Sequence, residues 1–71
     1  MDRTEKKSWL RFVDQASDEE LQRAEGSLRA DLELATHPDV RWSINWRLRA
    51  LREELGARAE VARLRKLYSA R

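Results

Sequence analysis

The feature that most constrains this chain is its C-terminal part, residues 38–71, which has the pattern of one long Arg-rich helix with two apolar stripes. At about 100° per residue, the two stripes lie roughly 120–160° apart around the helix. The first consists of Val40, Ile44, Leu48, Leu51 and Leu55, and the second of Trp42, Trp46, Ala50, Ala57, Val61, Leu64 and Tyr68. A helix with two apolar faces must be covered twice, so the pattern predicts a partner for the second face.

Length and composition limit which interactions can cover the second apolar face. The chain has 71 residues, which we interpret as one small domain over residues 1–71. A chain of this size buries only about 60% of the surface that its unfolded form exposes. It has no cysteine and a single histidine, so neither disulfides nor a structural zinc site supports the fold, and oligomerisation remains. With 39% charged residues, two glycines and one proline, the composition is typical of an all-α protein.

Two shorter helices are expected before the long one. The first covers about residues 4–15, and its apolar residues follow the i, i+3, i+4, i+7 spacing of an amphipathic helix: Trp9, Phe12, Val13 and Ala16. The second covers about residues 17–35. It begins at Ser17, a helix-capping residue, and Glu20 stands three residues on to complete a capping box. Its apolar stripe consists of Leu21, Ala24, Leu28, Leu32 and Ala35.

Pro38 separates the second helix from the third. The residue before a proline avoids the α region, so the second helix should end by His37, whereas proline suits the first turn of the next helix. A link of about two or three residues between helices forces an antiparallel hairpin. The second helix then faces the first stripe, and Leu28 and Leu48 are predicted to be buried in the shared core.

Gly56 leaves two alternatives for the end of the chain. The second helix spans roughly 27 Å, whereas a continuous third helix would span about 50 Å, so its hairpin partner ends near Leu55. Either the third helix breaks at Gly56 and folds back, or it continues to about residue 69 and pairs with another chain. We favour continuation because residues 57–62 are strongly helix-forming. The expected oligomer interface consists of Ala57, Val61, Leu64 and Tyr68.

The residues that catalysis or cofactor binding requires are scarce. His37 is the only imidazole, and there is no cysteine nucleophile, Gly-rich phosphate loop or metal-spaced ligand set. Glu53 and Glu54 are neighbours on a helix, so they point about 100° apart and do not converge on one substrate atom. No apolar run approaches the roughly 18 residues of a membrane span. We therefore expect no enzyme, cofactor or metal, no membrane association, and a cytoplasmic location.

The candidate binding surface is centred on Trp42 and Trp46, which lie one helical turn apart with arginines between them. Trp and Arg dominate binding hot spots because they bury large areas and make directed polar contacts. The predicted protein-binding residues are Trp42, Trp46, Arg41, Arg49 and Arg52. Two alternatives stay open: the tryptophans pack in the core under the first helix with Trp9 and Phe12, or they stack on single-stranded nucleic acid.

The charge distribution provides a second candidate surface. Residues 1–37 hold six basic and nine acidic side chains, whereas residues 38–71 hold nine basic and four acidic ones. A basic strip along the third helix could follow phosphates: Arg41, Arg52, Arg63 and Lys66. Alternatively, these long side chains flank the apolar stripes and keep the helix solvated, as is common at coiled-coil edges.

Together these patterns predict an all-α chain with a short N-terminal helix, an antiparallel hairpin and a long basic C-terminal helix, completed by dimerisation. The leading functional hypothesis is a non-catalytic regulatory or inhibitory protein that binds another protein, as a homodimer. The alternative is a small dimeric nucleic-acid-binding regulator. In size and Arg/Ala/Leu-rich composition the chain resembles small accessory proteins of phages and mobile elements.

Overall fold

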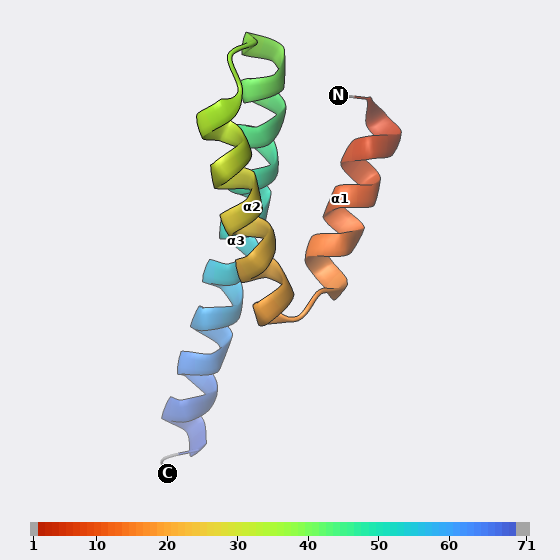
Figure 1. Ribbon diagram of the computed structural model, residues 1–71. Helices are drawn as coiled ribbons and strands as arrows, with labels where there is room; N and C mark the ends of the chain where they lie inside the picture. The colour runs from red at the N-terminus through yellow and green to blue at the C-terminus, as the bar shows by residue number, and fades with distance from the viewer. Residues whose placement is uncertain (1, 70–71) are drawn as a thin grey trace.

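Three helices make up the part of the chain that the computed structural model describes, residues 2–69 (Figure 1). They are α1 (Arg3–Gln15), α2 (Asp18–Leu34) and α3 (Pro38–Ser69). The helix α2 runs antiparallel to α3, and α1 lies beside this pair with its C-terminal end at the start of α2 (Figure 1). The all-α class and the hairpin are confirmed, and each helix begins and ends within about one residue of its expected bounds.

The helix starts are fixed by side-chain caps. In α1 the Asp2 Oδ1 accepts a hydrogen bond from the Glu5 N–H at 2.8 Å. At the start of α2 the Ser17 Oγ accepts from the Glu20 N–H, and the Glu20 Oε1 accepts from the Ser17 N–H, both at 3.1 Å. The predicted capping box is therefore present. These bonds to the Ser17 backbone and hydroxyl lower the pKa of the Glu20 carboxyl below its ordinary value.

Replacing Ser17 by alanine is expected to weaken α2 and to raise the pKa of Glu20. The loss of a Ser N-cap costs about 0.5–2 kcal/mol of stability. Since the folded state lowers the Glu20 pKa, its contribution is present above the unfolded-state value and is lost as the pH falls through the folded value. An NMR titration of Glu20 in the two proteins measures the shift. An unchanged Glu20 pKa in Ser17→Ala would show that the hydroxyl does not hold this carboxylate.

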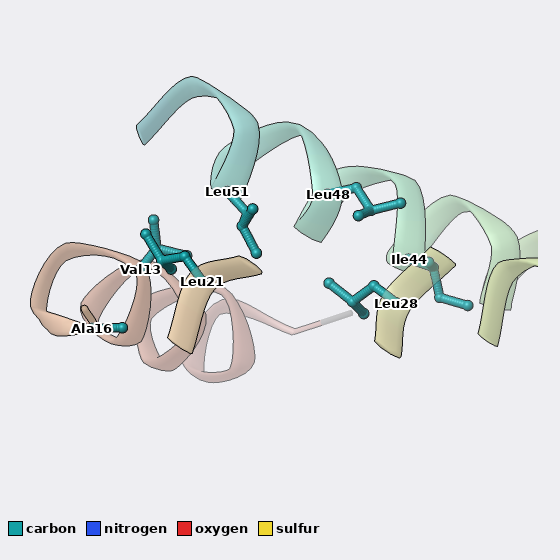
Figure 2. Close-up of a cluster of buried hydrophobic side chains, with 7 residues drawn as sticks. All are labelled: Val13, Ala16, Leu21, Leu28, Ile44, Leu48 and Leu51. Carbon is teal, nitrogen blue, oxygen red and sulfur yellow. The ribbon is translucent and has the colours of Figure 1, made fainter. Parts of the chain in front are cut away.

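The hairpin core lies between α2 and α3, and α1 closes one end of it. Leu21 and Leu51 are fully buried at the level of the α1–α2 turn, while Leu28 and Ile44 lie farther along the same interface (Figure 2). Among residues 2–69, the buried cluster consists of Val13, Ala16, Leu21, Leu28, Ile44, Leu48 and Leu51. Leu28 and Leu48 are both buried, as predicted.

One residue of the first stripe is not in this core. Val40 keeps 49% of its surface exposed, so its expected place in the hairpin interface is wrong. The helix α2 ends at Leu34, and the connection that follows leads directly into Pro38. The first turn of α3 therefore lies at the connected end of the hairpin, where no further turn of α2 covers it.

The helix α3 does not break at Gly56. It is continuous from Pro38 to Ser69, and neither described glycine adopts a positive φ. Residues 57–69, here called the arm, project beyond the α1–α2 turn, as the blue end of α3 shows in Figure 1, and give the molecule extents of 52 × 25 × 16 Å. The alternative in which this segment folds back on its own chain is contradicted.

Candidate functional site

The two tryptophans of α3 lie at the surface, beside the first turns of α1. Trp42 is 54% exposed and Trp46 is partly buried, and neither belongs to the buried cluster. The ammonium group of Lys6 lies 5.4 Å from the Trp42 ring centroid and 5.6 Å from a Trp46 ring centroid. Such cation–π contacts orient aromatic rings without covering them. The interpretation of both rings as core residues does not match this arrangement.

A shallow groove lies next to the tryptophans, between α1 and α3. It is lined by Leu10, Trp46, Arg49, Ala50 and Glu53. Leu10 is a large apolar side chain that remains about half exposed. The Arg49 Nε donates to the Glu53 Oε1 at 3.3 Å along one rim. We call Leu10, Trp42, Trp46 and Arg49 the Trp surface.

Two of the predicted protein-binding arginines instead hold α2 against α3. The Arg41 Nη1 donates to the main-chain oxygens of Leu32 and Ala35, both at 2.9 Å. Arg41 thus satisfies carbonyls at the C-terminal end of α2, where a helix leaves them without partners. The Arg52 Nε donates to the Glu25 Oε2 of α2 at 3.0 Å.

The residues of the predicted basic strip lie in different environments. Arg41 and Arg52 make the contacts with α2 just described. Arg63 lies on the arm and pairs with Glu60, one turn away, at 3.0 Å. Lys66 is exposed on the last turns of the same segment. Only the arm part of the strip therefore lies clear of α1 and α2.

The predicted oligomer interface forms the apolar side of the arm. Val61 and Leu64 are each nearly half exposed, Tyr68 is 72% exposed, and Ala57 is exposed at the base of the segment. Leu67, which the sequence analysis did not include, is a further exposed apolar residue of the arm. Exposed large side chains that cluster on one segment are typical of an interaction surface.

The main contact that sequence reasoning missed is made by Arg58. Its guanidinium donates to the Glu54 Oε2 at 2.8 Å, to the Asp18 Oδ1 at 2.9 Å and to the main-chain oxygens of Val13 and Asp14 at 3.1 and 3.2 Å. The hydrogen bonds to Asp18 and Glu54 raise the pKa of this guanidinium. Arg58 thereby joins the end of α1, the start of α2 and the middle of α3.

A second missed contact attaches the other half of α1. The Trp9 Nε1 donates to the Arg47 main-chain oxygen at 3.1 Å, and the Arg47 guanidinium lies 5.7 Å from the Trp9 ring centroid. The Arg47 Nε is buried and has no hydrogen-bond partner among residues 2–69, so the indole face is its main neighbour. The sequence contains the Trp and Arg side chains but gives no spacing signal for a contact 38 residues apart.

The described residues also limit the chemistry of the site. Residues 2–69 bring no three His, Cys, Asp or Glu side chains together in a way that could hold a metal ion. The His37 Nδ1 accepts from the Asp39 N–H at 3.3 Å, which is a capping contact at the start of α3. Within the same range, none of the helices combines the length and the apolar character that crossing a bilayer requires.

Comparison with known proteins gives no family model that matches the chain and no significant match among curated proteins or solved structures. The Trp surface and the arm are the two exposed apolar features described above.

Proposed function

We propose that this chain is a non-catalytic regulatory protein that inhibits or modulates another protein by docking the Trp surface onto it. The observation that carries the proposal is the exposure of Trp42, at 54%, next to the groove lined by Leu10 and Trp46. The indole of Trp is one of the largest apolar side-chain surfaces, and folding usually buries most of it. An exposed indole beside a groove is therefore typical of a binding hot spot.

Rigidity supports this proposal. The Trp surface lies on α3 and α1, and α3 is held along one side by the buried leucines of α2. Arg41 and Arg52 add fixed contacts between these two helices. A surface that is already ordered loses little conformational entropy on binding, which favours affinity.

The alternative function, nucleic-acid binding by the basic strip, receives less support. Arg41 and Arg52 donate to groups of α2, and Arg63 pairs with Glu60. Phosphate contacts would have to replace these bonds, and of the four strip residues only Lys66 is exposed and makes no such contact among residues 2–69. We therefore treat nucleic acid as an outcome of the test.

The test compares two double variants in capture experiments from cells in which the chain is native, with mass spectrometry and with and without nuclease. In Trp42→Ser/Trp46→Ser, binding of the partner protein should fall by at least about 30-fold, since a hot-spot residue contributes about 2 kcal/mol or more. Arg63→Glu/Lys66→Glu should weaken it only modestly, because exposed charges are screened by salt. Circular dichroism checks that both variants stay helical.

The opposite pattern would support the nucleic-acid alternative. Charge reversal would then abolish binding, nuclease would release the partner, and affinity would fall steeply with added salt as counterions are released. Equal binding by both variants and the original chain would show that neither surface is used.

A further inference from the structure

We infer that the Trp surface is first occupied by a second copy of this chain, whose arm packs antiparallel against it. This inference rests on the proposed function, because it names a partner for the same surface. The arm supplies the matching half: its apolar side chains are exposed and no described element covers them. Past Arg58, whose guanidinium contacts α1 and α2, the arm extends clear of both helices (Figure 1), so another chain can approach it.

The second stripe of α3 is continuous from the Trp surface to the end of the arm. Its positions are Trp42, Trp46, Ala50, Glu53, Ala57, Val61, Leu64 and Tyr68, so the steps between them are 4, 4, 3, 4, 4, 3 and 4 residues. This is an 11-residue repeat, which stays on one side of a nearly straight helix, at about 3.67 residues per turn. One face of α3 can therefore contact another straight helix along its whole length.

The stripe has almost the same spacing when it is read in the opposite direction from about Leu55. A two-fold axis at that level places Trp42 opposite Tyr68 of the second copy, and Trp46 opposite Leu64 of the second copy. Ala50 then lies close to Val61 of the second copy. Such an interface is self-complementary, as a closed two-fold dimer requires. Each arm covers the tryptophans of the other chain.

The charges that flank the stripe are complementary in this register. Arg49 and Glu60 lie on the same flank of the stripe and are both exposed. Antiparallel helices bring equivalent flanks together, so Arg49 faces Glu60 of the second copy, and the symmetry axis repeats the pair. Along the same flank, Trp42 meets Leu67 of the second copy, which matches an apolar residue with an apolar residue.

The groove between α1 and α3 fits the arm in the same register. Its lining by Leu10, Trp46 and Ala50 provides an apolar floor at the level that Leu64 and Val61 of the second copy reach. Pairing the two arms with each other would cover only the arm residues. It would leave Trp42 exposed and would place no basic side chain opposite Glu60 on its flank.

The dimer has a consequence for regulation. Since the arm of the second copy and the partner protein use the same Trp surface, they compete. The chain binds its partner as a monomer, and the dimer is a masked form whose population rises with protein concentration.

The register is tested by disulfide formation in Arg49→Cys/Glu60→Cys. The chain has no cysteine of its own. Positions 49 and 60 of one chain lie about 16 Å apart along α3, far beyond the Cα separation of about 7 Å that a disulfide tolerates, so no bridge forms within a chain. Oxidation should convert most of the protein into a covalent dimer on a non-reducing gel. A product that stays monomeric while circular dichroism remains helical would overturn the inference.

Three controls define the outcome. The single variants Arg49→Cys and Glu60→Cys should form little covalent dimer, because equivalent positions lie well apart along antiparallel helices; equal cross-linking of singles and double would overturn the register. Leu64→Gln should shift the chain to a monomer in sedimentation equilibrium at about 10 μM. The original chain is measured at the same concentration, because the dimer population depends on it. Leu34→Gln, the same change at a leucine of α2 that is 82% exposed against 44% for Leu64, should leave the dimer intact.

The same proteins separate this inference from the proposed function. If the oxidised dimer forms but no variant captures a partner protein, the proposed function is wrong and the dimer stands. If the partner is captured through Trp42 and Trp46 but no cross-link forms, the inference is wrong and the proposed function stands. If both hold, the oxidised dimer captures at most one tenth of the partner that the same double variant captures when reduced. Arg49 is missing from both forms, so the difference between them reports the masking alone.

Discussion

Replacing Leu48 by alanine is expected to lower the free energy of unfolding by about 2–5 kcal/mol, because it opens a cavity in the hairpin core. Leu48 is 2% exposed and lies between Ile44 and Leu51 along the contact with α2. A domain of this size has a total stability of only about 4–10 kcal/mol at the usual value per residue. The variant should therefore contain a measurable unfolded fraction. Urea titration followed by circular dichroism gives the comparison at one fixed protein concentration.

Leu34→Ala is the matched control. Leu34 is 82% exposed near the end of α2, so the same truncation removes almost no buried contact there. Its effect should be within about 0.5 kcal/mol. Similar losses in the two variants would mean that α2 and α3 do not pair as described.

Arg58→Gln is expected to give the largest loss of melting temperature among substitutions of the charged residues of α3. The guanidinium donates to Glu54 and Asp18 and to main-chain oxygens of α1, so its removal leaves several acceptors without their donor at the junction of the three helices. Thermal unfolding by circular dichroism measures the change. In addition, the tryptophan fluorescence should shift, because the end of α1 loses its hydrogen bonds to the Arg58 guanidinium.

Arg49→Gln is the control for the ion pair alone. Arg49 also pairs with a glutamate four residues on, at 3.3 Å, but within residues 2–69 its exposed guanidinium makes no hydrogen bond or ion pair with α1 or α2. Pairs of this kind contribute only a few tenths of a kcal/mol to a helix. The two variants should be compared under conditions in which both are monomeric. If both variants lowered the melting temperature equally, the contacts of Arg58 with α1 and α2 would contribute nothing to stability.

Local signals in the sequence predicted the helices because each signal acts over only a few residues. Ser17 and Glu20 form their capping box within one turn, and Pro38 begins α3 four residues after α2 ends at Leu34. The pairing of α2 with α3 could also be predicted from the sequence. A short link forces the two helices to run antiparallel, and their apolar stripes are then buried by facing each other. Leu28 and Leu48 were placed in the core on this basis.

The position of α1 against α3 could not be predicted from such local signals. The Glu54–Arg58 pair could be predicted from its spacing, but the reach of Arg58 to Asp18 and Val13 depends on where the α1–α2 turn lies against α3. The same applies to Trp9 and Arg47, whose contact joins residues far apart in sequence. For Arg41, the position near the start of α3 indicated a surface charge, whereas the end of α2 provided main-chain acceptors for it.

The candidate surface was predicted in part. The exposure of Trp42 depends on α1 covering α3 with Lys6 rather than with an apolar side chain, which the sequence alone does not show. The exposed arm followed from a comparison of helix lengths. Its role in dimerisation stays a prediction until the cysteine variant is tested.

The unequal attachment of the three helices also sets the order in which the chain assembles. The link between α2 and α3 is short, so their contacts close a small loop at little entropic cost and form early. Contacts of α1 with α3, such as those of Trp9 with Arg47 and Val13 with Arg58, join residues 38 and 45 positions apart. We therefore expect the hairpin to form first and α1 to dock last. By the same logic α1 should be the first helix to detach, which would take Leu10 away from the Trp surface while the α3 residues of that surface stay ordered on the hairpin.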